Sequence, residues 1–288
     1  MHIVVCMKQV PDSAQIRVHP VTNTIMRQGV PTIINPFDLF ALEEALRWRD
    51  RLGGEVTAVT MGPPPAEEAL RKAMPFGADR AVLLSARAFA GSDTLAPSYA
   101  LSETLRRIGR EFGDPQLVFT GKQTIDGDTA QVGPGIARRL GLNQLTYVSR
   151  IAELDPAGGR IVVERRAEGG VQVLRTALPA LITMLEGTNE IRRGSLDDAY
   201  RAALAPVIVW NASDAGISDL TLCGLRGSPT IVKKVFAPEI RAAKARLIPV
   251  AERGAAQIAE DALDAVFSLQ PGVEAALLRP AQGTQQGT

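Results

Sequence analysis

The sequence predicts an α/β fold: a mostly parallel, doubly wound sheet with an antiparallel extension and a C-terminal arm. Strand-like apolar segments alternate with helix-like segments over about the first 140 residues, which is typical of a parallel sheet covered on both faces. A polar loop with several glycines joins one of these strands to the next helix, and the pattern changes after it. We expect a main domain at 1–205 and an appended region at 206–288.

The parallel part is expected to contain four strands and the helices between them. The strands are short apolar runs, at 2–7, 54–61, 80–84 and 116–120. The helices have start signals, such as Asn35 as N-cap before Pro36, and are expected at 36–51, 66–74, 93–110 and 131–140. A hairpin-like excursion with strands at 15–18 and 24–27 precedes the first helix.

The second half of the chain has a different pattern. Glycine pairs separate some of four consecutive strands, which predicts an antiparallel extension at 144–154, 160–167, 171–177 and 180–184. Ser195 is a candidate cap for a short helix at 196–203. Residues 206–238 are expected to form an arm with little core of its own, before a terminal helix at 252–269 and a disordered polar tail at 282–288.

Composition argues against several classes of function. The net charge of +1 and the aromatic content of 5% disfavour nucleic acid and an anionic membrane surface. No apolar run is long enough to span a bilayer. The two cysteines indicate a reducing compartment, so a cytoplasmic location is expected. Only two histidines occur, which disfavours a histidine metal site and a Ser–His–Asp triad.

The loop from Gly121 to Pro134 is the most informative stretch of the chain. A strand, a polar loop of small residues and a helix start can hold a phosphate, because free backbone N–H groups and the helix dipole face the anion. The spacing fits neither the P-loop nor G-x-G-x-x-G. The alternative is an ordinary turn in which Asp126 or Asp128 caps the helix. The loop alone leaves both interpretations open.

Other polar segments are expected beside this loop. Ligands of open α/β sheets bind beyond the carboxyl ends of the strands, near a change in strand order. Residues 6–12, 35–38 and 124–135 are expected at that edge with Met61, and their groups suit an adenine edge, a ribose and a phosphate. Each of these segments alone is weak evidence for a ligand site. Lys8 is equally consistent with a solvated surface lysine, Asn35 with a helix cap and Met61 with a core residue.

The two acidic residues of the loop do not predict a metal site. No other metal ligand lies near Asp126 and Asp128 in the sequence, and the loop lacks a calcium-binding spacing. No partner for acid–base chemistry can be named either. We assign these two residues structural and ribose-binding roles, and we expect Thr129 to donate its hydroxyl to a phosphate.

Several motifs occur in the order and spacing of a known family. They are Cys6-Met-Lys-Gln-Val-Pro-Asp12, Asn35-Pro-Phe-Asp38, Val59-Thr-Met-Gly-Pro63, Gly77-Ala-Asp79, Gly121-Lys-Gln-Thr-Ile-Asp126, Glu164-Arg-Arg-Ala-Glu-Gly-Gly170 and Leu178-Pro-Ala-Leu-Ile-Thr-Met184. Over residues 1–205 the chain resembles the beta subunit of electron transfer flavoproteins. The resemblance implies a Rossmann-like, adenine-nucleotide-binding domain and a heterodimer with an alpha subunit that carries the electron-transferring FAD. It also implies that the arm contacts the alpha subunit.

The resemblance leaves open which nucleotide this subunit holds. Housekeeping members keep a structural AMP and shuttle electrons from dehydrogenases to the respiratory chain. The loop ending Val132-Gly133-Pro134, Gly127 and the Gly227-Ser-Pro-Thr230 segment resemble the electron-bifurcating branch instead. Beta subunits of that branch hold a second FAD, which takes electron pairs from NADH. Gly127 is consistent with this, because it lets the backbone approach a larger ligand. We therefore predict that this subunit binds FAD, with AMP as the alternative nucleotide.

The family's functional residues carry over to matching positions. The implied nucleotide contacts are Cys6, Asn35, Asp38, Met61, Thr124, Ile125, Asp126, Asp128, Thr129, Ala130, Gln131, Val132 and Gly133. Leu196 matches the exposed leucine that docks onto an acyl-CoA or other dehydrogenase, and the alternative is a leucine packed inward. A quinone oxidoreductase, or a ferredoxin or flavodoxin, is the implied acceptor.

Two other classes of protein fit less well. An ATP pyrophosphatase of related fold would need a Ser-Gly-Gly-x-Asp-Ser type of loop after the first strand, where this chain has Met7-Lys-Gln-Val-Pro-Asp12. A universal-stress-type adenylate sensor would be about half as long and would lack the strands at 144–184. A bound flavin absorbs visible light and AMP or ATP does not, so a spectrum separates these classes from a flavoprotein.

Overall fold

The computed structural model describes residues 1–12, 31–231, 247–250 and 253–277. The chain divides into two compact units, Met1–Phe236 and Ala237–Thr288, which are treated separately here. Within the described residues, no helix combines the length and the apolar content needed to cross a membrane.

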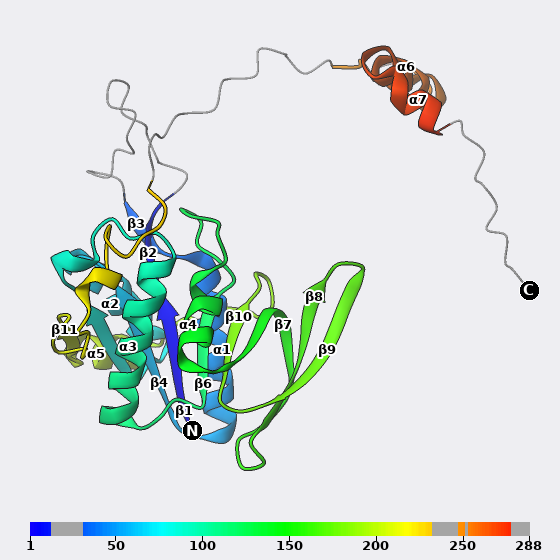
Figure 1. Cartoon of the computed structure of the whole chain (residues 1–288). Coiled ribbons are helices and arrows are strands. Elements are labelled where there is room, and N and C mark those ends of the chain that lie inside the picture. The colour runs from blue at the N-terminus through cyan, green and yellow to red at the C-terminus, as the bar shows by residue number, and fades with distance from the viewer. Residues whose placement is uncertain (13–30, 232–246, 251–252, 278–288) are drawn as a thin grey trace, which may run out of the picture. The chain divides into compact units, whose positions relative to one another are not determined.

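The first unit is built on a nine-stranded sheet with the order β11-β5-β4-β1-β6-β10-β7-β8-β9 (Figure 1). Neighbouring strands are parallel from β11 to β7, and the β7–β8 and β8–β9 pairs are antiparallel. The predicted fold class is therefore confirmed. The strands are β1 (His2–Met7), β4 (Glu55–Met61), β5 (Arg80–Leu84), β6 (Leu117–Gly121), β7 (Asn143–Asp155), β8 (Arg160–Ala167), β9 (Gly170–Ala177), β10 (Ala180–Met184) and β11 (Val207–Trp210).

Helices cover both faces of the parallel part of the sheet. The residues of α1 and α2 pack with one side of the strands in a core that includes Leu46, Leu70 and Phe119. The residues of α3 and α4 pack with the other side, around Ile108 and Ile136. The main helices are α1 (Pro36–Leu52), α2 (Glu67–Ala73), α3 (Leu95–Phe112), α4 (Val132–Leu140) and α5 (Leu196–Leu204). Short 3-10 turns occur at Pro64–Ala66, Met74–Phe76, Arg87–Phe89 and Leu220–Leu222.

The strand order changes direction between β1 and β6. From β1 the chain proceeds through β4 to β5 on one side, and it then returns to β6 on the other side of β1. Such a switch point leaves a crevice beyond the carboxyl ends of the two central strands, with helices from opposite faces on either side. The loops that follow β1 and β6 come together at this switch point, where Lys8 pairs with Asp126 at 2.8 Å.

The predicted antiparallel extension needs a correction at its last strand. β7, β8 and β9 are antiparallel as expected, but β10 lies between β6 and β7 and is parallel to both. All five residues of β10 are buried. A continuous apolar run is typical of a central parallel strand, whereas β8 has buried residues at alternate positions and β9 is largely exposed.

The region after Pro206 also differs from the prediction of an arm with little core. β11 pairs in parallel with β5 and adds a strand to the edge of the sheet, and Trp210 is buried there. The four-residue strand is too short to show an alternating pattern in the sequence.

The excursion before the first helix is described only at its two ends. There β2 (Gln9–Pro11) pairs antiparallel with β3 (Thr32–Ile34). The predicted strands at 15–18 and 24–27 lie outside the described residues, as does the polar tail at 282–288.

The second unit contains two helices. They are α6 (Ala255–Leu269) and α7 (Pro271–Leu277), where the sequence predicts one helix at 252–269. Leu263, Val266 and Leu269 of α6 are exposed in this unit.

Candidate functional site

Asp38 joins the loops that follow the two central strands. It lies in the first turn of α1 and is 4% exposed. Its carboxylate accepts hydrogen bonds from the backbone N–H of Lys8, at 2.8 Å, and of Gly121, at 2.9 Å. Burial raises the pKa of Asp38 to about 7, although both N–H groups oppose the shift. Gly121 permits this contact, because a Cβ there would lie 2.5 Å from the Cβ of Phe37.

Asn35 supports the same region from the start of α1. It occupies the N-cap position as expected, but its side chain makes no capping hydrogen bond. The buried amide instead donates to the Gln123 carbonyl at 2.9 Å and accepts from the Ile125 N–H at 3.2 Å. Asn35 therefore holds the beginning of the loop after β6, which the interpretation as a cap alone misses.

Cys6 and Met61 lie near the ends of neighbouring strands. Both belong to the core on the α3 and α4 side of the sheet, with Cys6 buried and Met61 partly buried at the end of β4. Burial, with the Asp38 carboxyl nearby, raises the pKa of the Cys6 thiol to about 12. The thiol is therefore protonated at neutral pH and is a packing group, not a nucleophile.

The side chains of the polar loop are bonded to neighbouring chain segments and do not cap α4. Asp126 pairs with the Lys8 ammonium at 2.8 Å, and Asp128 accepts from the Gln123 amide at 2.6 Å. Burial alone would raise the pKa of Asp126, but the Lys8 charge lowers it overall. The alternative in which one of these aspartates caps the helix is therefore wrong, and Lys8 is more than a solvated surface lysine. Among the described residues, no three possible metal ligands come together.

The first turn of α4 has no acidic residue, and its N-cap residue Gln131 makes no capping hydrogen bond. The Gln131 side chain instead accepts from the Thr94 hydroxyl at 2.8 Å. Gly133 lets the helix start pack tightly on the sheet, since a Cβ there would lie 2.9 Å from the Thr120 hydroxyl. No side chain therefore caps the backbone N–H groups of this turn, and such groups with the helix dipole are the donors that anions use at helix starts.

The backbone before this helix turn is shaped by two residues with positive φ. Asp128 has φ of 51° and Ala130 has φ of 55°, a conformation that non-glycine residues adopt rarely. Thr124 and Ile125 are partly buried, while Thr129 is exposed. The predicted loop contacts thus lie between the end of β6 and the first turn of α4, and the Thr129 hydroxyl is exposed. The donor set of N–H and O–H groups fits a phosphate or pyrophosphate.

Asp93 links the segment 227–230 to the start of α3. Its carboxylate accepts from the N–H groups of Leu95 and, on the other oxygen, from the Thr230 hydroxyl at 3.0 Å. The Ser228 hydroxyl accepts from the Asp93 N–H at 2.9 Å. The sequence places Asp93 at a helix start but does not predict the contact across more than 130 residues.

Leu196 begins α5 and is 87% exposed. Ser195 caps the helix in a capping box with Asp198, as the sequence suggests for a short capped helix. The alternative in which Leu196 packs inward is therefore wrong for this chain. Sequence reasoning missed Tyr200 and Leu204, which are also exposed; their spacing of four residues from Leu196 was the available signal.

Comparison with known proteins agrees with the fold and with the family resemblance of the motifs. The family described as "Electron transfer flavoprotein domain" matches residues 22–215. "Protein FixA" of Azorhizobium caulinodans is 69% identical over 284 residues, which cover 98% of this chain and 100% of that protein. "Protein FixA" of Bradyrhizobium diazoefficiens is 64% identical over 287 residues, which cover 100% of this chain and 98% of that protein.

A more distant relative carries the family name. "Electron transfer flavoprotein subunit beta" of Clostridium acetobutylicum is 45% identical over 241 residues, which cover 84% of this chain and 90% of that protein. These matches extend over most of both chains and agree with the motif-based resemblance. The chain therefore belongs to the electron transfer flavoprotein family, as a member of its beta-subunit group.

Proposed function

We propose that this chain is the nucleotide-binding beta subunit of a heterodimeric electron transfer flavoprotein and that its crevice holds FAD. The observation that carries the proposal is the start of α4. It lies at the switch point of the sheet, and neither a capping side chain nor an acidic residue occupies its first turn. A pyrophosphate is the anion that such a helix start suits in α/β folds.

Gly127 favours a large ligand. Its backbone does not have the positive φ that would require glycine, and a Cβ there would meet only the Thr124 hydroxyl, at 3.2 Å. Backbone conformation therefore does not require the glycine, and the one tight contact is with a side chain that a shift of a few tenths of an ångström would relieve. A missing side chain at an exposed loop position instead leaves room for a ligand to approach the backbone.

The chain's own residues would have distinct tasks around the nucleotide. Asn35 and Asp38 hold the loops after β6 and β1 in place, and the loop N–H groups with Thr129 contact the phosphates. Cys6 and Met61 supply apolar surface at the strand ends. FAD, when bound, accepts and releases electrons, whereas the protein contributes position and electrostatics. We assign NADH as the donor. The proposed acceptors are an acyl-CoA or other dehydrogenase or a quinone oxidoreductase, together with a low-potential ferredoxin or flavodoxin.

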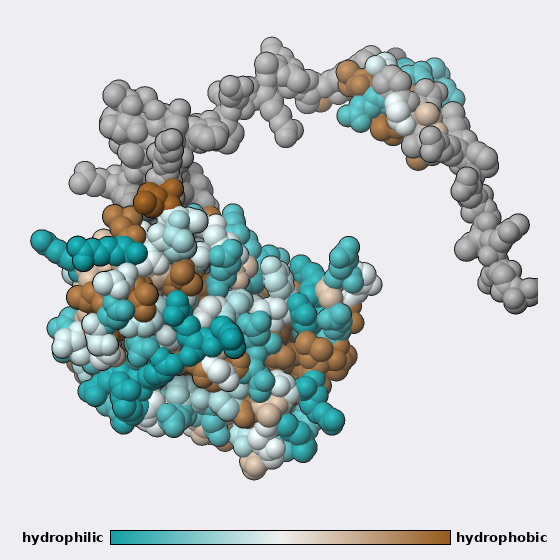
Figure 2. Space-filling view, in the orientation of Figure 1, coloured by the Kyte–Doolittle hydropathy of each residue, from teal (hydrophilic) through white to brown (hydrophobic). Residues whose placement is uncertain are grey.

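The alpha subunit is the proposed stable partner. β9 is the edge strand of the sheet and exposes Val171 and Val173, and Figure 2 shows an apolar patch over this part of the molecule. An exposed apolar edge strand is rare on a free monomer. The second unit exposes leucine and valine side chains of α6 as well. Both surfaces suit burial in a heterodimer.

The experiment is to co-purify the heterodimer and to count flavins per dimer by their visible absorbance. FAD in this subunit gives two flavins per dimer, and reduction by NADH then tests the donor. One flavin with one AMP, after purification with excess FAD, would show that this nucleotide is structural and that the housekeeping alternative holds. Family membership stands in either case.

A further inference from the structure

A cavity of about 290 Å³ lies between the C-terminal half of α1 and the middle of β7. Three arginines line it: Arg47 and Arg51 of α1, and Arg150 of β7. Glu44 is the one carboxylate among the described residues of the lining. Arg47 follows Asn35 by 12 positions, which is about 18 Å along a helix, so the cavity is separate from the nucleotide crevice.

The two arginines of α1 have little counter-charge of their own. Arg47 reaches one oxygen of Glu44 at 3.5 Å, and its side chain is 41% exposed. The Arg51 guanidinium lies 5.2 Å from the centre of the Trp48 ring, and within the described residues it forms no ion pair or hydrogen bond. Contact with an aromatic face uses none of the N–H donors of a guanidinium. Arg47 and Arg51 are four positions apart, so like charges repel on one side of the helix.

The other charged groups at the cavity offset this charge only in part. Arg150 donates from Nε to Glu164 of β8 at 3.0 Å, and its side chain is 60% exposed. Glu44 is 7% exposed, and it already accepts from the Trp48 indole at 2.9 Å and from the Asn189 amide at 3.2 Å. Three cations therefore face two carboxylates, even when Glu164 is counted, and the cavity keeps a net positive charge.

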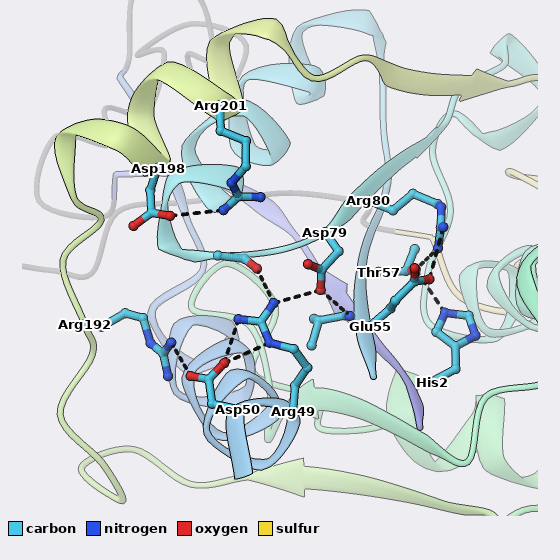
Figure 3. Close-up of polar contacts among 12 residues, drawn as sticks. His2, Arg49, Asp50, Glu55, Thr57, Asp79, Arg80, Arg192, Asp198 and Arg201 are labelled. Carbon is cyan, nitrogen blue, oxygen red and sulfur yellow. Dashed lines mark hydrogen bonds and ion pairs between the residues drawn. The ribbon is translucent and has the colours of Figure 1, made fainter. Parts of the chain in front are cut away.

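The opposite side of α1 has matched charges. Arg49 lies about 200° around the helix from Arg47. It pairs with Asp50 and with Asp79, each at 2.8 Å, and Arg192 pairs with Asp50 at 2.7 Å (Figure 3). Burial alone would raise the pKa of Asp50, but the two arginines lower it overall. The excess of positive charge is thus confined to the side of the helix that lines the cavity.

We propose that this cavity binds the phosphate group of a small molecule, held by Arg47 and Arg51 from α1 and by Arg150 from β7. A phosphate presents oxygens in several directions and can accept from guanidinium groups on both sides, whereas a carboxylate presents one edge. Small-molecule sites have volumes of roughly 300–1,000 Å³, so this cavity suits a compact ligand. A bound phosphate would also relieve the repulsion between Arg47 and Arg51.

The site would connect the helix that holds the crevice loops with the antiparallel extension. α1 carries Asn35 and Asp38 near its start, and Arg47 and Arg51 near its end. An anion that bridges α1 and β7 would stabilise the folded chain in proportion to its occupancy. The inference does not depend on which nucleotide the crevice binds.

The test is equilibrium dialysis of radiolabelled inorganic phosphate against the heterodimer that retains its own nucleotides, with chloride keeping the ionic strength constant. The filled crevice then offers no second phosphate site. The double variant Arg47→Gln with Arg51→Gln is compared with Arg138→Gln. Arg138 is an exposed arginine of α4 and has no ion pair or hydrogen bond among the described residues. The native protein and Arg138→Gln should bind about one phosphate per heterodimer, and the double variant should bind at least tenfold more weakly.

Ala152→Glu provides a second variant that does not remove a native charge. Ala152 is an exposed residue of β7 in the lining, so a glutamate there brings a carboxylate to the arginines. It should abolish phosphate binding without lowering the melting temperature or the flavin content. Competition by glycerol phosphate then identifies the source of the phosphate group. Tighter binding than that of inorganic phosphate assigns the site to a phosphorylated metabolite, and equal or weaker binding assigns it to free phosphate.

Three results would overturn the inference. The first is no saturable binding to the native heterodimer, or equal binding in the double variant and in Arg138→Gln. The second is competition by acetate as strong as that by phosphate at the same ionic strength. The third is binding to this chain alone that requires Arg47 and Arg51 but is absent from the heterodimer, because a group of the alpha subunit would then cover the cavity. The flavin count tests the proposed function separately in every case.

Discussion

The two walls of the crevice differ in where their polar groups are bound. On the α1 wall, Asn35 and Asp38 are buried, and their side-chain atoms accept or donate to backbone groups of the neighbouring loops. On the α4 wall, the loop side chains are mostly exposed and the first helix turn has no cap. The side chains of the first wall are thus bonded within the protein, whereas the helix start of the second wall has backbone N–H groups that no side chain caps.

This difference separates two kinds of predicted site residue. A residue of the α1 wall shapes the crevice by holding loops, so its loss should act on folding first. A residue of the α4 wall is proposed to contact the ligand, so its loss should act on binding first. Substitutions on the two walls should therefore rank differently in the free energy of unfolding and in nucleotide occupancy.

The largest loss of stability is expected for Asp38→Ala. It leaves the N–H groups of Lys8 and Gly121 buried without an acceptor, at a cost of about 3 kcal/mol at pH 5.5, where the carboxyl is neutral. Urea unfolding of this chain, purified without the alpha subunit, measures the change in unfolding free energy. Thr129→Ala is the control on the other wall and should change the unfolding free energy little, because Thr129 is exposed and is not among the residues with positive φ. Similar losses in both variants would remove the proposed distinction between the walls.

The free energy of unfolding should depend on pH, because burial raises the pKa of Asp38 in the folded chain. Its pKa is raised from 3.8 to about 7 in the folded chain, so the unfolded chain loses this proton first as the pH rises. The contribution of Asp38 therefore falls between about pH 4 and pH 7, by at most about 4 kcal/mol, and is constant above that range. The measurement is the difference in unfolding free energy between the native chain and Asp38→Asn across this range. A difference that does not change with pH contradicts the expectation.

Asn35→Ala is expected to cost about 2 kcal/mol, since the carbonyl of Gln123 and the N–H of Ile125 both lose their partner. Asn35→Asp keeps the acceptor for Ile125 and should recover part of the loss in the same unfolding experiment. If Asn35 acted only as an N-cap, Asp would replace it fully, because both residues cap helices equally well.

Asn35 also shows which features of the structure can be predicted from the sequence and which cannot. Its position before a proline correctly predicts the start of α1, because that signal is local. Its bonds to residues about 90 positions later depend on which strands become neighbours. No local pattern carries that information. The order of β1 and β6 is set by packing of the whole sheet.

The same reason explains the other differences. The alternation of strands and helices predicts the parallel sheet, because each crossover is local in sequence. Whether the run 180–184 pairs with β9 or enters the sheet beside β6 depends on total burial, and its five buried residues favour the centre. The candidate site residues were predicted mainly from the motif resemblance. The ion pairs of Lys8 with Asp126 and of Arg192 with Glu43 could be found only from the structure, which shows where the partners lie.

Lys8→Gln should have a smaller effect than Asn35→Ala. The ammonium pairs with Asp126 at 2.8 Å but is 47% exposed, and exposed ion pairs contribute at most about 1 kcal/mol. Unfolding at low and at high salt measures the contribution, which should shrink as salt screens the pair. A loss that is large and independent of salt would place Lys8 among the structural residues of the α1 wall.

The smallest change in stability, and the largest in nucleotide binding, is expected for Gly127→Asp. The position is exposed, has no positive φ and meets only the Thr124 hydroxyl, at 3.2 Å, so the folded chain accommodates a side chain after a small shift of Thr124. A side chain at this position should nevertheless disfavour binding of FAD. The new carboxylate would place bulk and negative charge beside a pyrophosphate held by the start of α4. Flavins per heterodimer should fall from two towards one, while the unfolding free energy of the nucleotide-free chain stays the same. Gly127→Asn adds nearly the same bulk without the charge and should lose less flavin. Equal losses in the two variants would assign the effect to space alone, and full occupancy in both would mean that the pyrophosphate does not lie against this loop.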